Sequence, residues 1–441
     1  MAGHCLPQTA RDRGTVTAIR APHLPESAIR ARARDGTAAI FPDVEGYGHT
    51  LFGGVPAAEP TADELDLAQV VPPVFVPRRL EKLCELGREP LHGDVDLTTS
   101  IGGFAAPLPV FLCAFGSTRV AGSGLGLAAS EQAGRLGIPM VIGENVVPMH
   151  GYGRSGDGPA DGLLGRILAY ADTAPTGLGG VVVQQSTEDA DAEVWNLVYS
   201  DPSATALLDS GRLAFELKVG QGAKPGLGGM TVLSRPAAAA VSEQYAVDEA
   251  FGPQATMVLR SSSPGTFTGE ILRQQVHLMR NNFPRARIWV KLHPGRDVRL
   301  AAEVAWNAGA DAVTVDGAEG GTGWAPSVFL NNVGLPLAEC LRRIGKHDAD
   351  LLVSGRIWEG SRALKCLAMG ASAVGLGRAA LVAVNEDAAD GLVRLVRCLE
   401  LELRLLLSAL GKYHLLDLDA ADLWFPGLPS PDQRGRKHDE S

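Results

Sequence analysis

The chain has 441 residues, enough to bury the core of one large domain or two, and 45% of them are hydrophobic. Its formal net charge is −10 and its pI is about 5.5. No basic run of useful length occurs outside the short stretch 434–437, which argues against DNA or RNA as a partner.

The cysteines and the apolar runs restrict the class of protein further. The six cysteines are scattered and form no C-x-x-C pair, which argues against a zinc site, an iron–sulfur site or a disulfide framework. Residues 1–30 contain no apolar core of a signal peptide, and no apolar run is long enough to span a bilayer. We therefore expect a cytoplasmic protein with reduced thiols, no metal and no membrane segment.

Residues 1–104 are rich in Pro, Gly and Arg and weakly periodic. This composition predicts an N-terminal extension with a few short helices that packs on the main domain. Residues 105–425 are predicted to form that domain, and the polar residues 426–441 a disordered tail.

Within the main domain, short apolar runs alternate with helical stretches, the pattern of βα units around a parallel sheet. Eight runs are predicted as buried strands: 109–115, 138–142, 180–184, 213–219, 287–292, 312–316, 351–354 and 373–376. The clearest helices between them are 124–136, 298–308 and 358–369. Eight strands with helices over roughly 300 residues predict a (β/α)8 TIM barrel.

Two loops of this barrel are long, and a late helix is amphipathic. The loop 143–179 is rich in glycine, whereas 221–287 includes a predicted strand at 255–260 and a helix at 269–281. Long loops at strand C-termini are where barrel enzymes build their sites. The helix 388–410 carries an apolar stripe that is predicted to pack on the barrel or on another subunit of a homo-oligomer.

A glycine-rich segment with two lysines follows the fourth predicted strand. It contains Lys218, Gln221 and Lys224 within the sequence ELKVGQGAKPGLGG, residues 216–229. Glycine lets the backbone approach a ligand closely, and lysines at a strand end are point charges for carboxylates or phosphates. The alternative is a solvated turn with two ordinary lysines.

Glycine-rich groups also follow the sixth, seventh and eighth strands, at 316–323, 354–356 and 375–378. A barrel phosphate usually binds after strands seven and eight, where backbone N–H groups and arginines supply donors. Each group alone could be a turn, a barrel corner or a surface ion pair, but together they predict a phosphate-bearing cofactor. Lys291, at the end of strand five, either balances Asp316 or stabilises negative charge on a reduced flavin.

Four motifs in this order resemble the FMN-binding domain of glutamate synthase: KxxQGAKPG at 218–226, VKL at 290–292, VDGxxGGT at 315–322 and VSG at 353–355. Residues 309–317 are also similar to stand-alone glutamate-synthase-like proteins, such as the catalytic subunit that makes N-methylglutamate from methylamine and glutamate. The resemblance covers residues 105–425 and implies a barrel that binds FMN.

The resemblance also implies roles for individual residues. Lys218, Gln221, Lys224 and Lys291 would be catalytic: the first three would contact a 2-oxo acid substrate or the flavin, and Lys291 the isoalloxazine ring. Lys218 and Lys291 would thus also bind the cofactor, together with Ala114, Phe115, Gly116, Glu144, Gly320, Gly321, Thr322, Gly323, Ser354, Gly355, Arg356, Gly375, Gly377 and Arg378.

The sequence departs from the family pattern at three places. Residues 381–391 contain none of the family's cluster cysteines, so we expect no iron–sulfur cluster, and no amidotransferase domain is seen, so no built-in glutaminase. Asn145 and Val146 replace two glycines, and Cys113 replaces a methionine, both on the substrate side. These changes predict an oxidase, dehydrogenase or internal-redox enzyme acting at the C–N bond of an amino or imino acid. Its flavin would be cycled by substrate, by oxygen or by a diffusing reductant, and a separate amino-donor or reductase protein is a candidate partner.

Two alternatives remain open at this point. One is FMN-dependent oxidation of a 2-hydroxy acid or a flavin-assisted isomerisation, with His293 and Arg296 as the available base and arginine. His150 is a further acid–base candidate, although such histidines are more often structural. The other is a non-catalytic regulatory subunit that binds flavin or a metabolite, motivated by the altered loop 143–146.

Overall fold

The structure is a computed structural model. It describes residues 19–21, 23–41, 63–115, 124–143, 162–187, 192–222, 231–239, 242–243, 246–261, 267–322 and 326–427. Most of the predicted C-terminal tail, residues 428–441, lies outside this part of the chain.

Eight parallel strands close into a barrel: β4 (Val110–Phe115), β5 (Met140–Ile142), β6 (Val181–Ser186), β7 (Leu213–Lys218), β11 (Arg287–Leu292), β12 (Ala312–Asp316), β13 (Leu351–Ser354) and β14 (Ala373–Leu376). The barrel closes where β14 pairs with β4, with Val374 opposite Val110. Each strand lies within two residues of its predicted bounds. The predicted TIM barrel is therefore confirmed.

The strands form here because their side chains are apolar on both faces. Alternate residues of one strand enter two different cores. Val110 and Leu112 of β4 face the layer between strands and helices, whereas Phe111 packs inside the barrel. The sequence therefore shows continuous apolar runs rather than an apolar–polar alternation.

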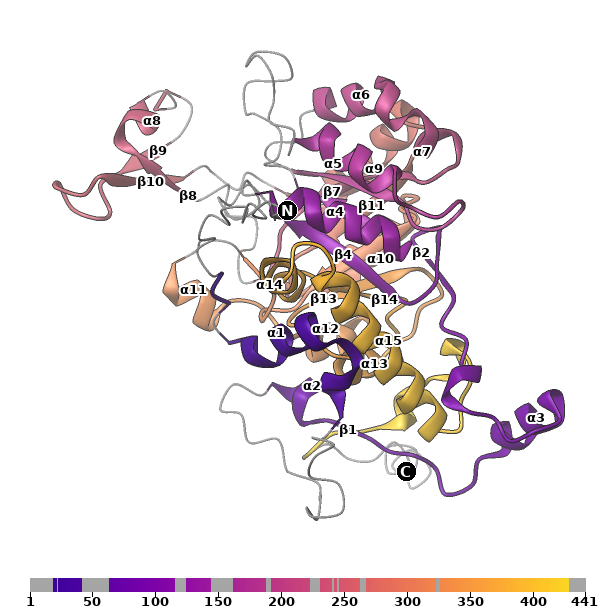
Figure 1. The fold of residues 1–441 in the computed structure, drawn as a ribbon. Coiled ribbons are helices and arrows are strands. Elements are labelled where there is room, and N and C mark those ends of the chain that lie inside the picture. The colour runs from indigo at the N-terminus through magenta and orange to yellow at the C-terminus, as the bar shows by residue number, and fades with distance from the viewer. Residues whose placement is uncertain are drawn as a thin grey trace, which may run out of the picture.

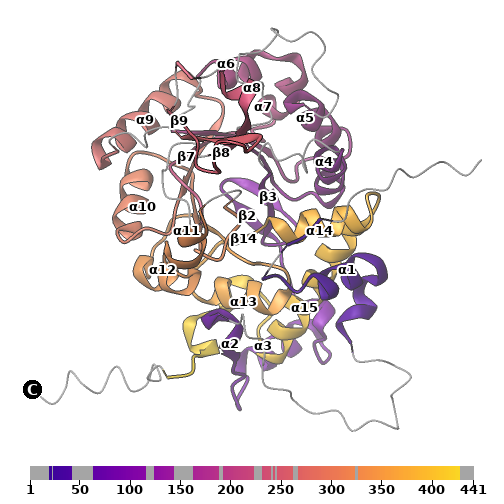
Figure 2. The same ribbon diagram turned by 90° about the vertical axis from the view of Figure 1, so that its left-hand side faces the viewer.

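Helices surround the barrel as a ring, which Figure 2 shows from one end. They are α4 (Leu125–Leu136), α5 (Leu163–Ala171), α6 (Ala192–Ser200), α7 (Thr205–Asp209), α9 (Gly269–Asn282), α10 (Val298–Asn307), α11 (Ser327–Asn332), α12 (Leu337–Ile344), α13 (Gly360–Ala368), α14 (Arg378–Glu386) and α15 (Gly391–Ala409). The short 3-10 turn η6 (Pro202–Ala204) precedes α7. Every predicted helix is present. The apolar stripe of α15 is buried against α13 and α14 of the same chain.

The N-terminal segment runs along the outside of the barrel, and in Figure 1 it ends near β2 at the right-hand side of the barrel. Its elements are α1 (Glu26–Asp35), η1 (Gly36–Ile40), α2 (Glu64–Leu67), β1 (Gln69–Val70), α3 (Pro77–Leu86), η3 (His92–Asp94), β2 (Thr99–Ile101) and β3 (Phe104–Ala106). Helix α1 packs on α14 and α15, and β1 pairs with β15 (Leu423–Trp424). The turns η7 (Leu415–Asp417) and η8 (Ala420–Asp422) lead into β15.

The β2–β3 hairpin closes the N-terminal end of the barrel. Its turn residue Gly102 accepts a hydrogen bond from the Trp289 indole N–H at 3.1 Å. The ring of Phe104 lies 5.6 Å from the Trp289 ring, centroid to centroid. Because these rings fill the barrel interior from below, ligand access is left to the C-terminal ends of the strands.

The long loop 221–287 carries a small antiparallel sheet in the order β8 (Thr231–Ser234), β10 (Met257–Ser261) and β9 (Ala246–Asp248), with α8 (Arg235–Ala239) after β8. In Figure 1 this sheet projects away from the barrel. The predicted strand at 255–260 is β10, whereas β8 and β9 were not predicted. No helix in the described part of the chain is long and apolar enough to cross a membrane.

Candidate functional site

A layer of buried polar side chains lies across the barrel toward its C-terminal end. Its members come from five neighbouring strands, and each is at most 7% exposed: Gln184, Glu216, Lys291, Thr314, Asp316 and Ser354. Buried charges are stable only when they are paired and hydrogen-bonded, so this layer has a defined internal arrangement.

The ion pair between Lys291 and Asp316 is central to the layer. The Lys291 Nζ lies 3.3 Å from Asp316 Oδ2. The Ser354 hydroxyl donates to Asp316 Oδ1, and the backbone N–H of Gly222 donates to Oδ2 at 3.2 Å. Burial acts to lower the pKa of Lys291, but Asp316, and then Cys113 and Glu216, raise it above its ordinary value. Lys291 is therefore a permanent cation at the barrel mouth.

Glu216 is a second buried carboxyl, and the sequence reasoning missed it. It accepts hydrogen bonds from the Gln184 side-chain amide and, at 2.9 Å, from the Thr314 hydroxyl. Burial raises its pKa despite the opposing effect of Lys291. The available signal was a glutamate inside an otherwise apolar predicted strand, two residues before Lys218.

The loops after β7 and β12 are joined by predicted site residues. Lys218 Nζ donates to the Gln221 side-chain oxygen at 3.2 Å, and the Gln221 amide nitrogen donates to the Thr322 carbonyl at 3.0 Å. A Cβ atom on Gly222, whose φ is +42°, would lie 2.6 Å from Thr322 Cγ2. The segment predicted to bind the substrate, after β7, therefore contacts the loop predicted to bind the phosphate, after β12.

The glycine-rich loops after β12, β13 and β14 pack closely. A Cβ atom on Gly355 would lie 3.2 Å from the backbone nitrogen of Gly317, and one on Gly321 would lie 3.5 Å from Arg378 Cγ. A Cβ on Gly375 would collide with Cys113 Sγ at 2.4 Å. The contact at Gly375 and the φ of +152° at Gly355 favour glycine at these two positions, whereas the distance at Gly321 is an ordinary van der Waals contact.

Three further predicted residues also lie at the C-terminal ends of these strands or just after them: Gly320, Ser354 and Gly377. Arg378 is the first residue of α14, and its guanidinium donates to the carbonyl of Glu319. Burial, followed by the nearby charge of Arg356, lowers the pKa of Arg378. The nearby carboxylates Glu319 and Asp316 act on the Arg378 pKa in the opposite direction, so this corner holds charges of both signs.

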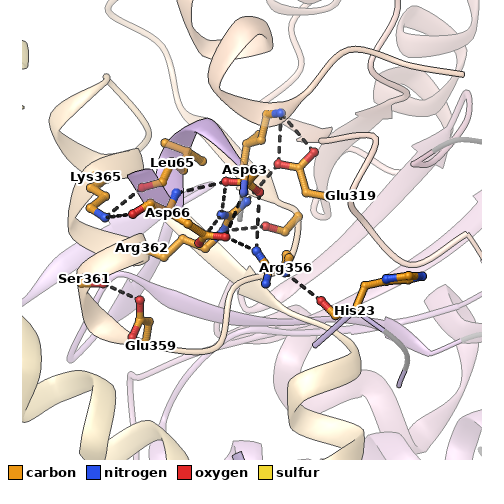
Figure 3. A network of polar contacts seen from close by, with 12 residues as sticks. His23, Asp63, Leu65, Asp66, Glu319, Arg356, Glu359, Ser361, Arg362 and Lys365 are labelled. Carbon is orange, nitrogen blue, oxygen red and sulfur yellow. Dashed lines mark hydrogen bonds and ion pairs between the residues drawn. The ribbon is translucent and has the colours of Figure 1, made fainter. Parts of the chain in front are cut away.

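Arg356 has protein partners in the structure. Its guanidinium pairs with Asp66, and its Nε donates to the carbonyl of His23 at 2.8 Å (Figure 3). Its φ of +57° lies in the left-handed region, which is unusual for a residue with a side chain. Its predicted contact with a phosphate stays a prediction.

Several predicted residues lie elsewhere or outside the described part of the chain. Ala114 packs against the barrel interior, and Phe115 ends β4. His293 is half-buried just after β11, where a Cβ atom on Gly220 would lie 2.8 Å from its Nδ1, whereas Arg296 is exposed. Outside the described residues lie Gly116, Glu144, Asn145, Val146, His150, Lys224 and Gly323.

No cluster of three or more His, Cys, Asp or Glu side chains that could hold a metal ion occurs among the residues that the structure covers. Five cysteines lie in the described part of the chain, and none of them forms a disulfide: Cys84, Cys113, Cys340, Cys366 and Cys398.

Comparison with known proteins shows what this chain is similar to. Residues 176–390 match the family model described as the conserved region in glutamate synthase. The chain is 34% identical over 191 residues to the archaeal-type glutamate synthase [NADPH] of Dehalococcoides mccartyi, covering 40% of this chain and 36% of that protein. It is 33% identical over 251 residues to a glutamate synthase large subunit-like protein of Rhizobium meliloti, covering 52% and 53%. The chain thus spans between a third and about half of the length of these relatives.

Solved structures share the fold at low identity. A soluble mutant of the membrane-associated (S)-mandelate dehydrogenase from Pseudomonas putida is 17% identical, with a TM-score of 0.53 over 91% of this chain and 99% of that one. A mandelate oxidase mutant with an FMN adduct is 20% identical, with a TM-score of 0.51 over 80% and 87%. In sequence, the chain is therefore similar to glutamate synthases, and residues 176–390 resemble their conserved region.

Proposed function

We propose that this chain is an FMN-dependent oxidoreductase of the glutamate synthase type that acts at the C–N bond of an amino or imino acid. The observation that carries the proposal is the buried Lys291–Asp316 pair at the barrel mouth, next to the linked residues Lys218, Gln221 and Thr322. A permanent cation at the barrel mouth would stabilise the negative charge that develops on the isoalloxazine ring when a flavin is reduced. The substrate class would be a 2-oxo acid or a glutamate-like amino acid.

The donor set at the strand ends fits FMN. The loops after β12, β13 and β14 have glycine at 321, 355 and 377, where no side chain can stand between the backbone and a ligand, and Arg378 supplies a positive charge. We propose that the backbone of residues 320–323, 354–356 and 375–377, with the side chain of Arg378, holds the phosphate. The guanidinium of Arg356 pairs with Asp66 and with the carbonyl of His23, so we assign to Arg356 a backbone contribution. When bound, FMN would supply a centre that accepts or returns a hydride.

Lys291 would act by electrostatics rather than by proton transfer. Its pKa lies above the ordinary value because Asp316 and its neighbours outweigh the effect of burial, so it stays charged at neutral pH. A buried, preorganised cation stabilises developing negative charge without reorganisation. Asp316 keeps the ammonium in place, and in turn Ser354 and Gly222 hold Asp316.

The substrate carboxylate would be bound by the 218–224 segment. Lys218 is a charged donor, and its bond to Gln221 orients it toward the loop that carries Thr322. Lys224 belongs to the same motif and is proposed to act with these residues. We further propose that a separate protein delivers the amino group or the electrons. We expect no iron–sulfur cluster in this chain.

The first experiment is purification of the full chain, an absorbance spectrum, and analysis of released flavin and of iron. We expect about one FMN per chain and no stoichiometric iron or sulfide. Protein that is colourless and releases no flavin contradicts the proposal. Stoichiometric iron and sulfide would instead contradict the predicted loss of the cluster.

A variant of Lys291 tests its role. Lys291→Met should slow reduction of the bound flavin by substrate about 100-fold or more, as for removal of one preorganised donor. Because this leaves Asp316 buried without its cation, the double variant Lys291→Met/Asp316→Asn is the folding control. Unchanged flavin reduction in both variants removes Lys291 from the mechanism.

Anaerobic mixing with different substrates separates the remaining candidate functions. Bleaching by glutamate or N-alkyl amino acids supports the proposal. Bleaching only by 2-hydroxy acids supports the hydroxy-acid oxidase, whereas bound flavin that no substrate reduces supports a regulatory subunit.

A further inference from the structure

A buried ion network links the N-terminal segment to the cofactor-side loops (Figure 3). Asp63 and Asp66, at the start of α2, meet two arginines that follow β13. Arg362 Nη1 lies 2.6 Å from Asp63 and 2.9 Å from Asp66, and Arg356 pairs with Asp66. Thus a helix nearly 300 positions earlier in the chain reaches the C-terminal ends of β12 and β13.

Arg362 is the centre of this network. It is fully buried, with 0% exposure. Besides the two aspartates it donates to the carbonyl of Gly355 at 3.1 Å and to the carboxylate of Glu319 at 2.9 Å. One guanidinium therefore holds the loop after β13 and the loop after β12 at the same time.

Glu319 extends these contacts to the third cofactor-side loop. Its carboxylate accepts the backbone N–H of Leu337 at 3.2 Å, and its backbone carbonyl accepts from Arg378. Arg378 begins α14, directly after β14. The network consequently reaches all three loops that we propose around the phosphate.

The aspartates of α2 are needed to keep Arg362 in this place. A fully buried guanidinium loses its hydration, and a single carboxylate partner would offset only part of this desolvation cost. Burial acts to raise the pKa of Asp63, but Arg362 lowers it below the ordinary value, so Asp63 is ionised at neutral pH. Arg362 therefore faces three carboxylates, two of which, Asp63 at 2.6 Å and Asp66 at 2.9 Å, come from the start of α2.

We infer that Asp63, Asp66 and Arg362 are positioning residues, and that α2 of the N-terminal segment sets the spacing of the phosphate-side loops. Arg362 touches the loops through Gly355 and Glu319, and the aspartates act through Arg362. The inference rests on the proposed function, because that proposal assigns the loops to the cofactor. It assigns to the N-terminal segment a part in cofactor binding.

The variant Asp66→Asn tests the inference, with Glu64→Gln as the matched control. Glu64 lies on the same helix and pairs with Arg342 of α12 instead of with the loops. In flavin-free protein, hydrogen exchange in peptides covering 317–322 and 354–359 should become about tenfold faster in Asp66→Asn. Glu64→Gln should leave these peptides unchanged. Equal exchange in the wild type and Asp66→Asn overturns the inference.

A second measurement compares FMN with riboflavin, which lacks the phosphate. Asp66→Asn should weaken FMN binding about tenfold and leave riboflavin binding unchanged, because only FMN uses the loops for its phosphate. Equal weakening of both flavins would show a general loss of structure and overturn the inference. If Asp66→Asn does not fold, Asp63→Asn replaces it with the same expectations, since asparagine can still accept the bond that caps α2.

The two measurements separate this inference from the proposed function. A wild-type protein that binds neither flavin refutes the proposed function, whereas the exchange experiment still decides whether α2 positions the loops. Wild-type FMN binding with an unchanged ratio of FMN to riboflavin affinity in the variants refutes the positioning role alone.

Discussion

At the scale of single residues, the barrel mouth holds two buried carboxyls for one buried ammonium. Asp316 is the partner of Lys291, whereas Glu216 receives its hydrogen bonds from the neutral Gln184 and Thr314. Burial raises the pKa of Glu216 accordingly. When Glu216 is protonated, the layer holds one cation and one anion, which lowers the cost of keeping these charges away from water.

This state predicts a pH dependence of stability. Because the pKa of Glu216 is raised in the folded protein, the unfolded chain loses this proton at a lower pH than the folded protein does. The contribution of Glu216 to the free energy of unfolding is therefore fully present below about pH 4.3, the ordinary pKa of glutamate. It is lost as the pH rises through the pKa of the folded protein. In Glu216→Gln this decline should be absent, since the Gln184 amide can turn to accept from the new side chain. Urea unfolding across this pH range measures it.

The control for this measurement is Glu339→Gln. The Arg343 side chain lowers the pKa of the partly exposed Glu339, so the contribution of Glu339 to stability is present at higher pH and lost on acidification. The two variants should change the slope of stability with pH in opposite directions. A Glu216→Gln profile parallel to the wild type would mean that Glu216 is ionised in the folded protein.

At the scale of elements, the β2–β3 hairpin depends on a glycine turn beneath the barrel. Gly102 has φ +53°, and a Cβ atom there would lie 2.3 Å from the Trp289 ring. The Gly102 backbone also receives the Trp289 N–H, and its own N–H donates to Asp350 at 2.8 Å. The hairpin can close the barrel only because the backbone touches the indole directly.

Substitution of this glycine should be costly for two separate reasons. Gly102→Ala should lower the free energy of unfolding by about 2–4 kcal/mol, of which about 1–2 kcal/mol is left-handed strain and the rest collision with Trp289. Gly211, with φ +67° and no atom within 4 Å of its Cβ position, provides the control with strain alone. Urea unfolding of both variants compares them, and equal losses would show that the ring moves aside at no cost.

At the scale of the whole molecule, the N-terminal segment is attached to the barrel at several distant points. Helix α1 packs on α14 and α15, β1 pairs with β15, and the β2–β3 hairpin fills the barrel interior. The Arg32 side chain adds an ion pair to Glu402 at 2.5 Å and lies 4.7 Å over the Trp358 ring. If the N-terminal segment or the barrel unfolds, surface of the other that was buried between them becomes exposed to water.

We therefore expect α1 and the barrel strands to unfold together. Hydrogen exchange in increasing urea should show peptides 26–35 and 110–115 losing protection at the same concentration. Helix α3, none of whose residues is buried, should exchange at lower urea and serves as the internal contrast. Earlier loss of protection in α1 than in the strands would show that the N-terminal segment is a separate folding unit.

The sequence by itself determined the barrel, because the apolar runs that form its eight strands and the periodic stripes of α10 and α15 are local signals. It also placed Lys218, Lys291 and Thr322 at strand ends, since parallel strands bring their C-terminal ends together. Elements with little burial, such as β8 and β9, gave no such signal and were missed.

Only the tertiary structure decided how charges are paired. Arg356 was expected at a phosphate, but its guanidinium meets Asp66, 290 positions away in the chain. Glu216 and Arg362 acquired their significance from burial, which no local pattern reveals. The physical reason is that ion pairing depends on distance and dielectric in the closed barrel, whereas strand and helix formation depend on the spacing of neighbouring side chains.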